Sequence, residues 1–78
     1  MRDEIFERLN EVFRDVFDDE EITVNDETTA ADIDGWDSLM HITLISAVED
    51  EFDISFNMKD VVKMKNVGDM ADLIEELA

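Results

Sequence analysis

The sequence predicts an all-α protein: a small four-helix bundle of three longer helices and one short helix, with a long loop between the first two helices. Proline is absent and glycine occurs only at Gly35 and Gly68, so few residues interrupt a helix. Leu, Ile, Val and Phe make up 24 of the 78 residues, enough for a core despite a formal net charge of −17. Many of these residues recur three and four positions apart, the spacing of a helix with one buried face.

The length and composition also limit the possible functions. Residues 1–78 are expected to form one free-standing domain, which starts at Met1 and ends directly after the last predicted helix. The 23 Asp and Glu residues outnumber the 6 Lys and Arg residues, which disfavours binding to nucleic acids and to anionic membranes. No segment resembles a signal peptide or a membrane span, so we expect a monomeric cytoplasmic protein without membrane insertion. With one His, no Tyr and no Cys, a carrier or binding role is favoured over an enzyme.

The first helix is predicted over residues 3–17, where Asp3 and Glu4 suit the positive end of the helix dipole. Its apolar stripe consists of Ile5, Phe6, Leu9, Val12, Phe13, Val16 and Phe17. The four acids at 18–21 repel one another and end the helix. A long loop over residues 18–37 follows. The apolar residues expected to hold it against the bundle are Ile22, Val24, Ile33 and Trp36.

The remaining helices each follow a capping residue. Asp37 caps a helix predicted over residues 38–52, and Asn57 caps a short helix near residues 57–64. Asn66 caps the last helix, predicted over residues 67–77, with Asp69 three residues later. The stripe of this last helix consists of Val67, Met70, Leu73, Ile74 and Leu77.

Ser38 is the first residue of the second predicted helix, directly after the loop. Its hydroxyl would lie beside unpaired backbone N–H groups and the positive end of the helix dipole, where a phosphate is favoured. Ser38 is therefore suited to carry a phosphodiester. The alternative is that Ser38 only starts the helix.

The segment Gly35-Trp36-Asp37-Ser38-Leu39, followed by an apolar helix that ends in Glu-Asp-Glu-Phe, resembles the acyl carrier proteins. The resemblance covers essentially the whole chain in length, acidity, helix order and long first loop. It implies that a phosphopantetheinyl transferase attaches 4′-phosphopantetheine from coenzyme A to Ser38, with Asp37 and Leu39 in the modification motif. The thiol of that arm would carry acyl groups as thioesters to enzymes of fatty-acid-like or specialised biosynthesis, such as polyketide-, lipid- or polysaccharide-related pathways. It would also explain why the chain needs no cysteine.

A helical wheel of the second helix separates a core arc from a polar arc. The core arc consists of Met40, His41, Leu44, Ile45, Ala47, Val48 and Phe52. On the polar arc, Leu39 and Ile42 form an apolar centre next to the attachment serine. We expect a docking patch for partner enzymes that consists of Leu39, Ile42, Ser46, Glu49 and Asp50. The alternative is that the long loop covers Leu39 and Ile42.

The acids are concentrated around this patch, because residues 15–58 contain 14 Asp and Glu and no Lys or Arg. We therefore expect partner enzymes that present a basic patch there. The short helix departs from the acidic pattern usual in fatty-acid carriers, since Lys59, Lys63 and Lys65 lie in it or just after it. Thr43 and Ser46 also depart from that pattern. These departures favour a dedicated carrier of a specialised pathway.

His41 and Trp36 have two interpretations each. His41 is either a core histidine with one hydrogen bond or a residue that lines the groove for the arm or acyl chain. Trp36 either anchors the loop or contacts the arm or a partner. Residues 32–43 do not match a calcium-binding loop, and we expect no metal site.

Two other functions stay open. An aminoacyl, peptidyl or D-alanyl carrier would have the same fold and the same serine. An unmodified acidic protein-interaction module would share only the charge.

Overall fold

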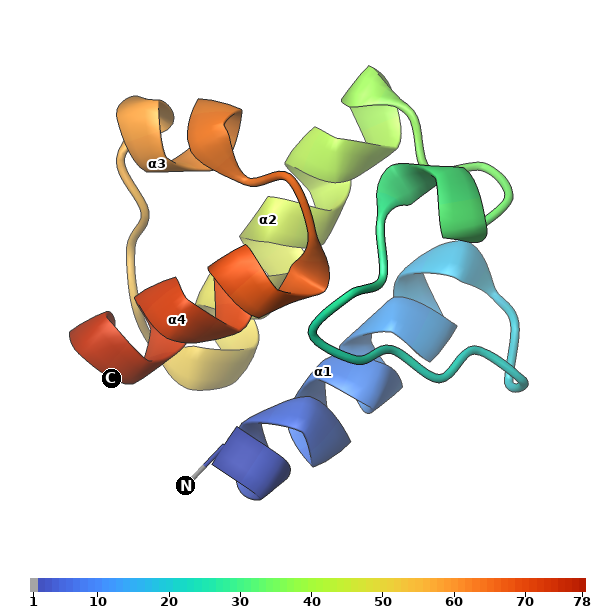
Figure 1. Ribbon diagram of the computed structural model, residues 1–78, viewed down its shortest axis with the longest axis horizontal. Coiled ribbons are helices and arrows are strands. Elements are labelled where there is room, and N and C mark those ends of the chain that lie inside the picture. Colours follow the sequence, from blue (N-terminus) through green and yellow to red (C-terminus); the bar gives the residue numbers. More distant parts are fainter. Residues whose placement is uncertain (1) are drawn as a thin grey trace.

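The computed structural model describes residues 2–78, which form a bundle of four α-helices and one short 3-10 helix (Figure 1). The elements, in chain order, are α1 (Arg2–Phe17), η1 (Ala30–Asp32), α2 (Ser38–Phe52), α3 (Met58–Lys63) and α4 (Val67–Leu77). No strand occurs among the described residues. The predicted all-α class and four-helix order are confirmed.

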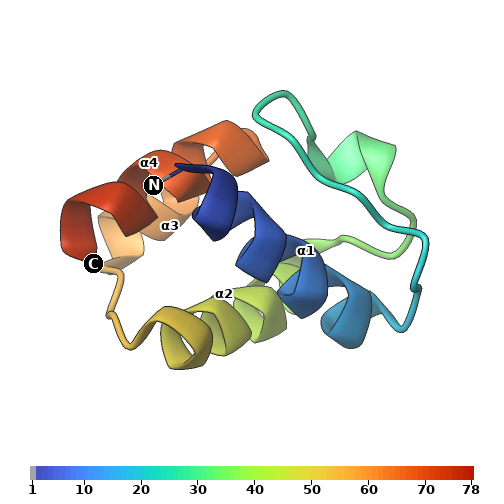
Figure 2. The ribbon, with the colours of Figure 1, turned by 90° about the horizontal axis from the view of Figure 1, so that it is seen from below.

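The core lies where α1 packs against both α2 and α4 (Figure 2). The buried apolar side chains are Leu9, Val12, Phe13, Val24, Ile33, Leu44, Ile45, Val48, Phe52, Val67, Met70, Ala71 and Ile74. Apart from Ala71, they come from the predicted apolar faces of three helices and from two loop residues, because each amphipathic face must be buried against another element. Leu77, which was predicted in the stripe of α4, is instead 44% exposed. Within residues 2–78, no helix is both long enough and apolar enough to cross a bilayer.

The long first loop lies against the bundle through the predicted apolar residues. Val24 and Ile33 are buried in the core, while Ile22 and Trp36 are partly buried against it. Polar contacts also fix the loop: the Val24 amide donates to Asn10 Oδ1 at 2.6 Å, and Arg14 Nε donates to the Ile22 carbonyl at 2.7 Å. The loop also contains η1, which was not predicted.

The predicted bounds of α2 and α4 are confirmed. α1 begins one residue earlier than predicted, at Arg2. The short helix is α3, which follows the predicted cap Asn57 and ends one residue before the predicted end. Asn57 is the N-cap, whose side chain accepts the Asp60 amide, and Met64 has an extended backbone with φ −68° and ψ 115°.

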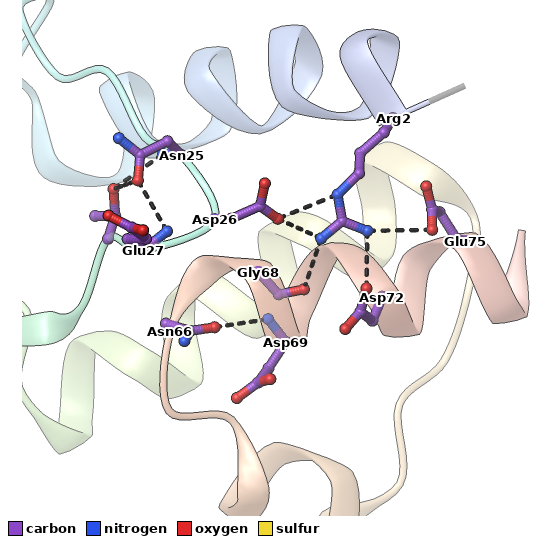
Figure 3. Close-up of polar contacts among 10 residues, drawn as sticks. Arg2, Asn25, Asp26, Glu27, Asn66, Gly68, Asp69, Asp72 and Glu75 are labelled. Atoms are coloured by element: carbon purple, nitrogen blue, oxygen red, sulfur yellow. Dashed lines mark hydrogen bonds and ion pairs between the residues drawn. The ribbon is translucent and has the colours of Figure 1, made fainter.

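Arg2 joins the start of α1 to the loop and to α4 (Figure 3). Its Nη1 donates to Asp72 Oδ1 at 2.8 Å and to Glu75 Oε2 at 3.2 Å. Its Nε donates to Asp26 Oδ1 at 3.1 Å, Nη2 contacts the same oxygen, and Nη2 donates to the Gly68 carbonyl at 3.3 Å. The hydrogen bonds to Asp26 and Asp72 raise the pKa of Arg2 above its ordinary value.

Candidate functional site

Ser38 lies at the point where the loop turns into α2. Gly35 has φ +86°, a left-handed conformation that glycine adopts at little cost. Asp37 follows with an extended backbone, and its side chain accepts the Met40 amide at 2.9 Å. This N-cap makes Ser38 the first helical residue, with an exposed side chain. The amides of Ser38 and Leu39 have no carbonyl one turn earlier in the helix to bond, so this end of α2 favours a phosphate.

A hollow of about 420 Å³ begins at Ser38 and extends between α2, α3 and the loop. Its lining residues are Ala30, Trp36, Asp37, Ser38, His41, Val61, Val62, Met64, Lys65, Asn66 and Met70. Larger hollows of about 610 and 670 Å³ lie over the loop and between α3 and α4, and neither includes Ser38. We relate the function to the smaller hollow because Ser38, the predicted attachment residue, lies on its wall.

His41 and Trp36 form a hydrogen-bonded pair at the wall of this hollow. The Trp36 indole N–H donates to His41 Nδ1 at 3.1 Å, and the two rings are stacked with centroids 5.9 Å apart. Trp36 also packs edge-on against the buried Phe13, at 5.3 Å. Because Nδ1 accepts a hydrogen bond, the neutral His41 ring has its proton on Nε2. Both side chains are half-buried. Trp36 packs on the core and His41 has one hydrogen bond, as expected for a loop anchor and a core histidine. Both side chains also line the hollow, as expected for residues that contact the arm.

The predicted docking patch is only partly free. Leu39 and Ile42 are 73% and 64% exposed, so the loop does not cover them. Ser46 and Asp50 are also exposed. Glu49 is half-buried, and its carboxylate accepts the Phe56 amide at 2.7 Å, which joins α2 to the segment before α3. A helical wheel could not show this contact, because it depends on the path of the chain after α2.

The arginines of the chain are used internally. Arg2 binds the carboxylates described above, and Arg14 donates to a loop carbonyl. Arg8 Nε lies 2.8 Å from Glu51 Oε2, and the guanidinium lies 4.4 Å from the centre of the Phe52 ring.

Two exposed residues were missed by the sequence reasoning. Met58 and Val62 on α3 are 77% and 79% exposed. Their four-residue spacing beside Lys59 and Lys63 was the available signal. Among residues 2–78, no group of three or more His, Asp or Glu side chains is arranged to hold a metal ion.

Comparisons with known proteins agree on one family. The family described as phosphopantetheine attachment site matches residues 7–74. An acyl carrier protein of Clostridium acetobutylicum is 31% identical over 71 residues, which cover 91% of this chain and 92% of that protein. The solution structure of a holo acyl carrier protein from Geobacter metallireducens is similar with a TM-score of 0.85 and 46% identity, covering 91% of this chain and 82% of that one.

Proposed function

Because the chain belongs to the acyl carrier protein family, whose cofactor is 4′-phosphopantetheine, we propose that Ser38 is the attachment site and that the protein carries acyl groups on the attached arm. Its fatty-acid-like or specialised pathway, its place in the cytoplasm and its role as a carrier without catalysis of its own are parts of this proposal. The single observation that supports it best is an exposed serine hydroxyl at the N-terminus of α2, on the wall of a hollow.

The residues around Ser38 fit a phosphodiester followed by a flexible chain. The N-terminal end of α2 favours the negative charge, and Asp37 fixes this end of the helix through its bond to the Met40 amide. The adjoining hollow has apolar walls, including Val61 and Met70, beside the polar ring of His41. In the modification step, the Ser38 oxygen would bond to the phosphorus next to the pantetheine, the pyrophosphate bond of coenzyme A would break, and adenosine 3′,5′-bisphosphate would leave with the bonding electron pair. The hydroxyl proton would pass to a base of the transferase. When bound, the arm supplies the thiol that holds the acyl group as a thioester.

The protein itself binds and positions. Leu39 and Ile42 provide an apolar centre for docking, with Ser46 and Asp50 beside them. Docking holds the tethered acyl group close to the active site of an enzyme. The effective concentration of the acyl group there is high, so the enzyme does not need to bind the group separately from solution. The phosphopantetheinyl transferase and the acyl-processing enzymes would be the partners, with basic residues facing the acidic side of α2.

Trp36 and His41 are proposed to line the groove for the arm. The Trp36 hydrogen bond fixes the tautomer of His41, so its Nε2–H is a donor for a carbonyl or phosphate oxygen. Since neither ring takes part in the attachment step, His41→Ala is expected to be modified as fully as the wild type. A folded His41→Ala protein that does not gain the arm would contradict this.

The attachment is tested by intact mass. The purified chain is incubated with coenzyme A, Mg²⁺ and a promiscuous phosphopantetheinyl transferase, and wild type is compared with Ser38→Ala. Ser55→Ala is the matched control, since Ser55 is an exposed serine outside the docking patch. One arm is expected on wild type and on Ser55→Ala, and none on Ser38→Ala. No arm on wild type, or an arm on Ser38→Ala, would disprove the assignment.

The cargo is tested on the modified protein. The enzyme that loads the modified protein is purified from extracts of the cells that produce this protein, with the loading activity as the assay. It is then supplied with carboxylic acids or with amino acids. If only amino acids are loaded, the protein is an aminoacyl, peptidyl or D-alanyl carrier and the assignment as an acyl carrier is wrong.

A further inference from the structure

α3 presents an exposed surface that no part of the described chain covers. At about 100° per residue, Met58, Val62, Lys59 and Lys63 lie in that order on one continuous arc, and all four are exposed. Val61 and Met64, on the opposite side, are half-buried against the core. We call the exposed set the basic α3 face: Met58, Lys59, Val62 and Lys63.

The positive charge on this face is available to a partner. All three arginines donate hydrogen bonds inside the bundle or its loop. Within residues 2–78, the ammonium groups of Lys59, Lys63 and Lys65 have neither an ion pair nor a hydrogen bond. The free side-chain cations therefore gather at α3 and the residues just after it, in a chain whose net charge is −17.

The face lies beside the attachment serine. Val62 and Lys65 line the hollow of about 420 Å³ that includes Ser38. Val62 and Lys63 also line the hollow of about 670 Å³ between α3 and α4, with Leu73. Two carboxylates of that second hollow are engaged, because Asp69 accepts the Lys65 amide and Asp72 pairs with Arg2. An enzyme that reaches the group on Ser38 therefore meets the basic α3 face at the same time.

We propose that the basic α3 face docks on the enzyme that loads the carrier, at an apolar depression flanked by Asp or Glu side chains. The same enzyme would meet the acidic side of α2 with basic residues, so its docking surface is divided by charge. Two adjacent exposed apolar side chains with two lysines beside them fit such a depression, with the ammonium groups at its rim. The inference rests on the proposed function, because it concerns the enzyme that acts on Ser38.

The other occupants are disfavoured by charge. A second copy would have to place its acidic α2 on the basic α3 face, which would bring together two chains of net charge −17. An anionic membrane would repel the rest of the molecule in the same way.

The test uses the modified protein and the loading enzyme purified as described above. Lys59→Gln/Lys63→Gln removes two positive charges, and the control Thr23→Glu/Ala78→Glu changes the net charge equally, at exposed positions in the loop and at the chain end. We expect the double glutamine variant to raise the KM for loading roughly five- to tenfold with kcat nearly unchanged, and the control to stay within about twofold. Met58→Ser/Val62→Ser should raise KM by a similar factor.

Each other outcome would overturn the inference. Equal KM values for wild type and both α3 variants would disprove docking through the basic α3 face and would leave the proposed carrier function unaffected. A wild-type dimer in sedimentation velocity that the lysine changes dissociate would assign the face to a second copy. Binding of wild type to phosphatidylglycerol vesicles, lost in the same variant, would assign it to a membrane. If the wild type gains no arm, or if no extract acylates it, the proposed function is disproved and the inference with it.

Discussion

At the scale of single residues, the fold depends on close contacts between the loop and α4. The Gly68 amide donates to the Asp26 carbonyl at 3.0 Å, and Arg2 binds both the Asp26 carboxylate and the Gly68 carbonyl. These contacts hold the loop at Asp26, ten residues before its aromatic anchor Trp36. The position of Ser38 is therefore linked to residues far from it in the sequence.

Gly68→Ala is expected to destabilise the protein more than Gly35→Ala. A Cβ on Gly68 would lie 2.6 Å from the Asp26 carbonyl oxygen, a backbone atom that can move only with the loop. We expect a loss of about 1–3 kcal/mol, as for other overpacked sites. Gly35 has open space around it but φ +86°, so its alanine variant should lose about 1 kcal/mol. Urea denaturation of the three proteins measures both losses, and equal stability of Gly68→Ala and wild type would refute the contact.

Arg2→Ala is expected to lower the free energy of unfolding by about 1 kcal/mol, because the ion pairs are partly exposed to solvent. Arg2→Lys keeps the charge but loses the forked geometry, so it should recover only part of the loss. The raised pKa of Arg2 fixes the pH dependence: the stabilisation is complete below the ordinary pKa of an arginine and is lost only above it. The difference between wild type and Arg2→Ala should therefore stay constant between about pH 6 and 9, and a difference that varies with pH in this range would count against it.

At the scale of elements, α3 is held least firmly among the α-helices of residues 2–78. It has six residues and no buried side chain, whereas α1, α2 and α4 each bury three or more. Its start depends on Asn57, whose side chain accepts the Asp60 amide at 2.9 Å. Since α3 carries the proposed docking face, its local stability bears on function.

Asn57→Ala is expected to open α3 with little effect on the rest of the bundle. The loss of the cap costs about 1 kcal/mol, which is large for a helix this short. Hydrogen exchange should therefore speed up at the Val61 and Met64 amides, which donate within this turn, while α1 amides change little. Asn57→Asp keeps an acceptor and serves as the control. Uniform acceleration across the chain would show instead that α3 unfolds only with the whole protein.

The helices could be predicted from sequence because their signals are local. α2 and α4 have both a capping side chain and an apolar stripe, and their bounds were right. η1 was missed, since three residues show no periodicity, although the amide of Thr29 bonds the Asp32 carboxylate in a readable Thr-x-x-Asp pattern. The contacts of Arg2 with Asp72 and of Glu49 with the segment before α3 depend on how elements pack, which no local pattern contains.

At the scale of the whole molecule, the charge is divided unevenly. Arginine ion pairs neutralise Asp26, Glu51, Asp72 and Glu75, while the free lysines lie at α3 and just after it. The loop from 18 to 37 contains acids and no basic residue. A partner therefore meets a basic α3 near Ser38 and the acidic C-terminal end of α2. The acidic loop faces solvent, and its carboxylates repel one another.

This repulsion predicts that salt stabilises the protein. Added NaCl screens the exposed carboxylates, and Mg²⁺ binds weakly among them, so both should raise the melting temperature from its value at low ionic strength. A gain of about 1 kcal/mol corresponds to roughly 4–8 °C for a domain of this size. Glu20→Gln/Glu21→Gln removes two exposed loop charges and should raise the melting temperature at low salt while reducing its salt dependence. Calorimetry across NaCl and MgCl₂ titrations measures both effects. A melting temperature that does not change in either titration would show that the self-repulsion of the native state is no greater than that of the unfolded chain.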